Sequence, residues 1–164
     1  RSGSSWLTDL IAQQKILGRP AEWFNPDLMQ SAMNGLSKRT HNIYEFCQEL
    51  QNTHRSKENY FGAELTATHL SMLSDLVNIQ QVFNQPSYIV LLRRNIVAQG
   101  ISLFLATETG FFHATNTINM NNQTQYNDEK IKKWINEILD DEQHIRRFIE
   151  RNQLNPLYIS QKKI

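Results

Sequence analysis

YIVLLRRNIVAQGISLFLATETGFF, residues 88–112, is the most apolar stretch of the chain and decides the predicted fold. Apolar residues recur in it every seven positions and widen into a broad face: Val90, Val97, Phe104 and Phe111, with Ile89, Leu92, Ile96 and Leu103. Positions with this spacing share one side of a helix, and a helix with so wide an apolar face is usually central in a bundle. The stretch therefore predicts a buried helix that begins near Tyr88. Its longest uncharged part, residues 95–107, is too short to cross a bilayer.

Helical spacing extends over most of the remaining chain, and no useful strand-like alternation interrupts it. Prolines and glycines fall mostly at the borders of the four further helices that we expect: Trp6–Leu17, Asn25 to about residue 51, about Tyr60–Val82, and Asp128–Arg151. We therefore predict an all-α fold, a single helical bundle of about five helices with long central helices.

The ends of the chain lack this helical spacing. Arg1-Ser2-Gly3-Ser4-Ser5 is typical of a linker or a cloning remnant, so we exclude residues 1–5 from the fold. We assign residues 6–152 to the helical bundle domain and residues 153–164 to a non-helical tail.

The composition excludes some classes of function. Lys and Arg number 17 against 16 Asp and Glu, which gives a net charge of +1. Binding to nucleic acid depends largely on basic residues that displace the counterions of the phosphates. This chain has no large basic excess, so we expect no nucleic-acid partner. Asn and Gln together make up 30 of the 164 residues, so the polar surface is largely neutral. Cys47 is the single cysteine, which excludes an internal disulfide and multi-cysteine zinc sites. It lies next to Phe46, and we expect a small buried hydrophobe there rather than a catalytic thiolate. We expect a cytoplasmic location, or secretion into a host cytosol without a cleaved signal peptide.

The tail contains Asn155-Pro156-Leu157-Tyr158, the Asn-Pro-x-Tyr pattern that phosphotyrosine-binding adaptor domains recognise. Asn-Pro starts a tight turn that presents the tyrosine, while the neighbouring residues add as a strand to a sheet edge. The plainer interpretation is that Asn-Pro only ends the preceding helix. We keep Asn155, Pro156 and Tyr158 as candidate partner-binding residues.

Phe111 and Phe112, which follow Gly110, are a second candidate contact. They are either core residues near a helix end or an exposed apolar edge that meets a partner or an apolar surface.

Catalytic patterns are few. The chain has no Gly-x-Ser-x-Gly elbow, no phosphate loop and no Gly-x-Gly-x-x-Gly motif. His41 with Glu45, and Asp141 with His144, have the spacing of metal ligands on helices. Di-metal bundles need Glu-x-x-His twice and two more carboxylates, so the set is incomplete, and surface histidines with local carboxylate partners are the plainer interpretation. We predict no cofactor and no metal.

Residues 23–118 resemble phasins, the helical proteins that coat polyhydroxyalkanoate granules. The resemblance is carried by Trp23-Phe24-Asn25-Pro26, by Gln-rich amphipathic helices, and by the break at Val82-Phe83-Asn84-Gln85-Pro86. It implies non-catalytic binding of an apolar surface. The charged helix at 128–151 and the Asn-Pro-x-Tyr tail depart from that family.

We therefore predict a non-catalytic helical protein that binds a protein partner or an apolar surface, with oligomerisation left open. Two alternatives remain. One is a protein, such as a secreted bacterial effector, that recruits an adaptor through residues 155–158. The other is a metal-dependent helical-bundle enzyme that uses His41, Glu45, Asp141 and His144.

Overall fold

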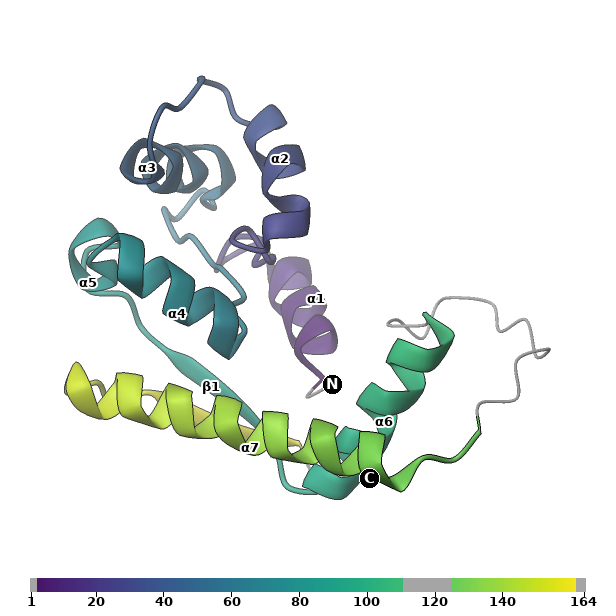
Figure 1. The fold of residues 1–164 in the computed structure, drawn as a ribbon. Coiled ribbons are helices and arrows are strands. Elements are labelled where there is room, and N and C mark those ends of the chain that lie inside the picture. Colours follow the sequence, from purple (N-terminus) through teal and green to yellow (C-terminus); the bar gives the residue numbers. More distant parts are fainter. Residues whose placement is uncertain (1–2, 111–124, 162–164) are drawn as a thin grey trace. The chain divides into compact units, whose positions relative to one another are not determined.

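The structure, a computed structural model, describes residues 3–110 and 125–161. These residues form seven helices and two strands (Figure 1). The chain divides into two compact units, one from Gly3 to Tyr88 and one from Ile89 onward.

The first unit is helical, and most of its helices start at a residue whose side chain caps the helix. Its elements are α1 (Ser4–Gln14), α2 (Pro26–Asn34), α3 (Ile43–His54), α4 (Ala67–Leu76) and α5 (Ile79–Val82). The caps of the last four are Asn25, Asn42, Thr66 and Asn78, and each accepts a hydrogen bond from a backbone N–H of the first turn. Such caps satisfy N–H groups that have no acceptor inside the helix.

Aromatic rings and the buried face of α3 form the core of the first unit. Phe24 meets Phe46 and Phe83 edge to face, with ring centroids 6.0 and 6.1 Å apart, and Phe61 stacks on Phe83. Leu50 and Cys47, both on α3, are the most fully buried side chains among the described residues. α3 also packs against α5.

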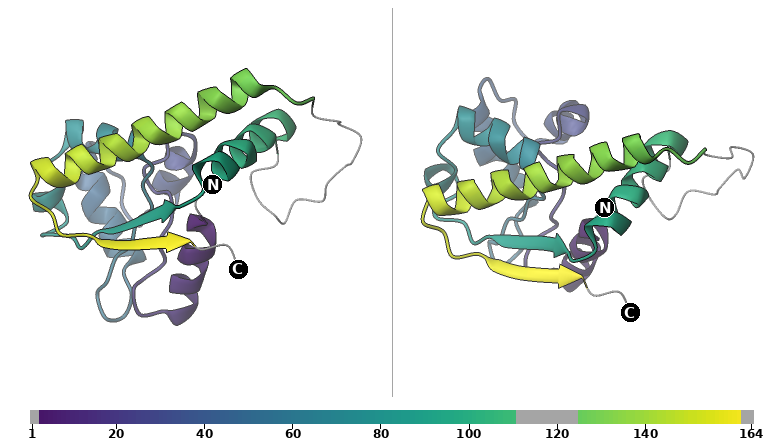
Figure 2. Two further views of the ribbon diagram at one scale, coloured as in Figure 1. Left: turned by 90° about the horizontal axis from the view of Figure 1, so that it is seen from below. Right: turned by 60° about the horizontal axis from the view of Figure 1, so that its bottom comes forward.

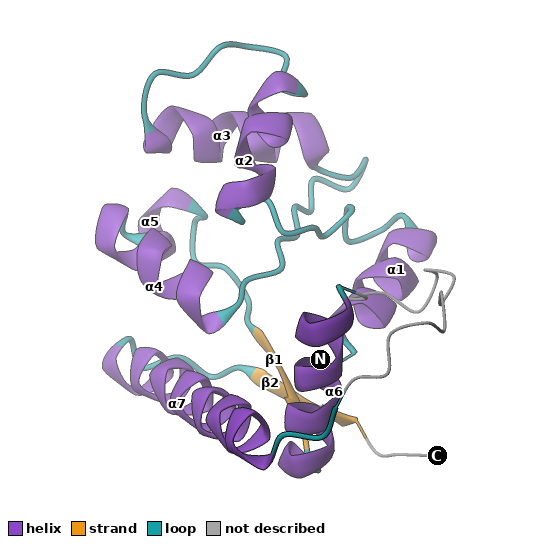
Figure 3. Ribbon diagram, turned by 45° about the vertical axis from the view of Figure 1, so that its right-hand side comes forward, coloured by secondary structure: helices purple, strands orange, loops and turns teal. Residues whose placement is uncertain are grey.

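The second unit joins two strands through two helices. β1 (Ile89–Arg93) is followed by α6 (Ile96–Thr109), α7 (Asp128–Arg151) and β2 (Leu157–Gln161). The two strands run parallel and side by side, with Ile89 opposite Leu157 and Arg93 opposite Gln161 (Figures 2 and 3). A parallel pair needs a long crossover, and α6 and α7 supply it.

α6 and α7 pack closely. Gly100, buried on α6, lies so near α7 that a Cβ built on it would stand 2.6 Å from Cγ1 of Ile135. A side chain at position 100 would push the helices apart, which explains a glycine inside a helix.

The predicted all-α bundle was wrong. The apolar stretch 88–112 contains β1 and then α6, and the tail contains β2. The helix that we expected to begin near Tyr88 begins instead at Ile96, because the Asn95 side chain accepts the N–H of Ala98 and caps α6 there. A short apolar run fits a buried strand as well as a helix, and here the parallel partner at 157–161 decides in favour of the strand.

The predicted long helices at 25–51 and 60–82 were also wrong, because each is two helices. The first breaks at Gly35 and restarts at Asn42, whose side chain exchanges hydrogen bonds with Glu45. The second consists of α4 and α5, with Asn78 capping the latter.

The prediction for Asp128–Arg151 is confirmed, since α7 has these bounds. No helix among the described residues is long and apolar enough to cross a membrane. The domain boundaries set at residues 5 and 152 stay predictions.

Candidate functional site

The turn between β1 and α6 places two arginines at the carboxyl end of a parallel strand. Arg93 is the last residue of β1 and is half-buried, and Arg94 follows it in the turn and is exposed. Asn95 then caps α6, its Oδ1 accepting the N–H of Ala98 at 2.9 Å. The strand pairing ends at Arg93, and the Asn95 side chain starts the helix two residues later.

The start of α6 adds positive potential to the two arginines. Its first turn carries no acidic residue. The first N–H groups of a helix have no acceptor within it, and the aligned peptide dipoles amount to about half a positive charge at that end. The first N–H groups of α6 therefore lie next to the turn that contains Arg94.

Gln99, one turn into α6, brings a further polar group. Its Oε1 is buried and finds no hydrogen-bond donor among the described residues. A buried, unpaired amide oxygen is costly, so this side chain is suited to a bound donor group or a water.

The start of α1, in the first unit, also has no acidic residue in its first turn. Gly3 precedes it with φ 90°, Ser4 and Ser5 are its first two residues, and no side chain caps it. The described residues place no side-chain cap on the first N–H groups of α1, and a helix start of this kind attracts anions.

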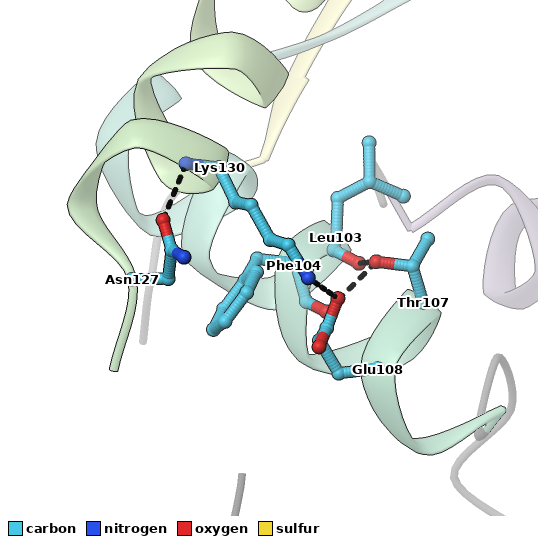
Figure 4. Close-up of polar contacts among 6 residues, drawn as sticks. All are labelled: Leu103, Phe104, Thr107, Glu108, Asn127 and Lys130. Atoms are coloured by element: carbon cyan, nitrogen blue, oxygen red, sulfur yellow. Dashed lines mark hydrogen bonds and ion pairs between the residues drawn. The ribbon is translucent and has the colours of Figure 1, made fainter. Parts of the chain in front are cut away.

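An ion pair joins the end of α6 to the start of α7, and a side-chain cap begins α7 beside it (Figure 4). Lys130 Nζ lies 2.8 Å from Glu108 Oε1, and the Lys130 N–H donates to Asn127 Oδ1 at 2.9 Å. The ion pair and the close packing at Gly100 are both contacts between α6 and α7.

The structure places the predicted tail site in and before β2. Asn155 and Pro156 precede the strand, and Tyr158 lies within it opposite Val90 with 55% of its surface exposed. The segment that we expected to add to a partner's sheet thus pairs with β1 of its own chain. Binding by Asn155, Pro156 and Tyr158 stays a prediction. Phe111 and Phe112 lie outside the described residues.

The metal-dependent alternative gains no support. Glu45 accepts hydrogen bonds from the His41 N–H at 2.8 Å and from the Asn42 side chain at 2.9 Å, so its carboxylate serves the start of α3. Partial burial raises the pKa of Asp141, and the nearby His144 partly offsets this. Among residues 3–110 and 125–161, no group of three or more His, Cys, Asp and Glu side chains is placed to hold a metal ion.

Arg93, Arg94 and Asn95 are the residues that sequence reasoning missed as a site. The predicted helix that begins near Tyr88 contains all three, so their position at a turn was not expected. The available signal was an apolar run that ends in Arg-Arg-Asn before helical spacing resumes.

The model of the Stf0 sulphotransferase family matches residues 1–164. No curated protein matches the chain. The family match overturns the resemblance to phasins, which rested on composition and on a loop sequence rather than on residues that carry chemistry. It also contradicts the predictions of a non-enzymatic interaction protein and of adaptor recruitment as the function. By a match over all 164 residues, the chain belongs to the Stf0 sulphotransferase family.

Proposed function

We propose that this protein is a sulfotransferase, an enzyme that moves a sulfuryl group from an activated anionic donor to a nucleophilic acceptor. With a phosphosulfate donor and a hydroxyl acceptor, the bond between sulfur and the bridging phosphate oxygen breaks, and a bond from sulfur to the acceptor oxygen forms. The phosphate leaves with the electron pair, and the hydroxyl proton passes to a base. The observation that carries the proposal is the family match over residues 1–164.

The turn between β1 and α6 supports this proposal because both substrate and product of the transfer are anions. Arg94 and the N–H groups that open α6 supply fixed positive potential with no acidic residue in the first helical turn. A guanidinium pairs with two oxygens of a phosphate or sulfate at once, which adds orientation to attraction.

Arginine and helix dipoles also suit the charge that develops during the reaction. Negative charge accumulates on the leaving phosphate oxygen as the bond to sulfur breaks. Preorganised donors aimed at developing charge typically contribute about 100-fold to 1,000-fold in rate per donor. We assign Arg94 and the start of α6 to binding of the donor's anionic groups, and we leave the base unassigned.

A binding measurement with matched variants tests this assignment. Calorimetric titration of the chain with a nucleotide phosphosulfate should show binding, and Arg94→Ala should weaken it about 10-fold or more, because a charge-assisted hydrogen bond is worth about 1.5–3 kcal/mol. Arg147, exposed on α7, provides the control, and Arg147→Ala should leave the affinity within about twofold. Equal affinities for the Arg94 and Arg147 variants would remove the turn from the site.

We also propose a reducing compartment such as the cytoplasm as the site of action. The proposal is supported by Cys47, which is free and fully buried.

A further inference from the structure

Trp23 holds three segments of the first unit together. We call residues 15–25, between α1 and α2, the first connector, and residues 55–66, between α3 and α4, the second connector. The Trp23 ring stacks on the ring of His54, the last residue of α3, with centroids 4.0 Å apart and planes 25° apart. Its Nε1–H donates to the Gly62 carbonyl at 3.1 Å. The side chain therefore joins the first connector both to α3 and to the second connector.

The surroundings of His54 favour the neutral imidazole. Its Nε2 is buried and has no hydrogen-bond partner among the described residues. A neutral ring can leave one nitrogen as an unprotonated lone pair, whereas an imidazolium must find acceptors for two N–H groups. Burial lowers the pKa of His54 from its ordinary 6.5, and the positive charge of Arg19 in the first connector lowers it further.

The other charges nearby do not reverse this preference. Arg55 follows His54 in the chain, and Lys57 and Glu58 lie in the turn beyond it; all three are exposed and screened by solvent. The opposing contribution is attraction between an imidazolium and the Trp23 ring, about 0.5–2 kcal/mol. The Trp23 ring offers no hydrogen-bond acceptor in the plane of the imidazole for the Nε2 proton. We therefore expect burial and the charge of Arg19 to outweigh this attraction and to favour neutral His54.

We propose that the Trp23–His54 stack is a pH-sensitive latch, closed while His54 is neutral and opened when the imidazole takes up a proton. Because the folded protein binds this proton less readily than the unfolded chain, the contribution of the stack is complete above pH 6.5. It is lost as the pH falls through the lower pKa of folded His54. Opening frees the Trp23 side chain from α3 and loosens the first connector.

Tryptophan emission tests the latch in the full chain. In a background of Trp6→Phe and Trp134→Phe, Trp23 is the only tryptophan. We expect its emission to shift to the red as the pH falls, in one transition with a midpoint below 6.5. His54→Gln, which cannot take up a proton, should abolish the transition, and His41→Gln, a change at an exposed histidine, should preserve it.

A titration of the unaltered protein covers the case in which His54→Gln does not fold. The ring proton signals of His54, followed by nuclear magnetic resonance, should give the same midpoint as the tryptophan emission. A His54 midpoint above 6.5 would mean that the imidazolium is held by Trp23 and would overturn the latch. Persistence of the emission transition in a folded His54→Gln variant would overturn it as well.

Discussion

At the scale of single residues, some positions in the structure have no room for a larger side chain. Gly100 is the clearest case, since α7 approaches its Cα so closely that a methyl group would meet Ile135. Cys47 is another, because its thiol is completely enclosed by the first unit's core. Each position gives a prediction that depends on local packing alone.

Gly100→Ala should destabilise the protein by about 1–3 kcal/mol, the usual cost of forcing extra volume into a packed interface. Gly35→Ala is the matched control, because Gly35 has φ −84° and its nearest neighbour would lie at 3.5 Å from the new methyl group. That change should be neutral or stabilise by up to about 1 kcal/mol. Urea unfolding followed by circular dichroism measures both, and equal effects would contradict the close approach of α6 and α7.

Cys47 should be unreactive in the native protein. Burial raises the pKa of its thiol to about 12, so almost no thiolate exists at neutral pH, and the side chain is shielded from reagents. We expect no labelling by an alkylating reagent until urea unfolds the chain. Rapid labelling of the folded protein, measured by mass spectrometry, would show that α3 is not packed as described.

The sequence alone predicted the burial of Cys47 but not the candidate site. It placed Cys47 as a small buried hydrophobe, which its complete burial confirms. It did not find the candidate site, because the role proposed for Arg94 depends on the turn between a strand and a helix rather than on the residue type. An Arg-Arg pair inside a predicted helix has the same composition as one at a helix start.

At the scale of elements, side-chain caps decide where the helices begin. Asn25, Asn42, Asn78, Asn95 and Asn127 all cap helices in this way. The high asparagine content is therefore partly a set of helix starts. A cap satisfies backbone donors that an exposed ion pair does not, so the two kinds of contact should differ in their effect on stability.

Asn127→Ala should cost about 1 kcal/mol, because the Lys130 N–H at the start of α7 loses its acceptor. Lys130→Met removes the ion pair with Glu108, in which 52% of the lysine side chain and 35% of the glutamate side chain are exposed. Its effect should lie between about 0 and 1 kcal/mol and shrink in high salt. Urea unfolding in low and high salt compares the free energies of unfolding of the two variants. If Lys130→Met lost more stability than Asn127→Ala, and the loss depended on salt, the predicted order would be contradicted.

The elements also show why sequence reasoning succeeded in one helix and failed in a strand. α7 was predicted with its bounds because one long amphipathic period runs from the Asn127 cap to Arg151. β1 was missed because five apolar residues fit either a strand or a helix, and its partner β2 lies more than sixty residues later in the chain. Local periodicity carries no information on such a distant pairing.

At the scale of the whole molecule, the near-neutral charge of +1 fits an enzyme better than a protein that coats a polyanion. The starts of α1 and α6 each lack an acidic residue in the first turn, and a helix start of this kind suits a small anion better than a long polyanion. The family match leads to the proposal of sulfuryl transfer, and the turn between β1 and α6 supports it.

The measurement that tests this claim most directly follows the sulfuryl group itself. The chain is incubated with a nucleotide phosphosulfate labelled in its sulfuryl group and a panel of hydroxyl acceptors, and labelled products are separated from donor. We predict label on an acceptor with matching release of the nucleotide phosphate, and a loss of about 100-fold or more in rate for Arg94→Ala but not for Arg147→Ala. A folded chain that binds no donor and transfers no label to any acceptor would contradict it.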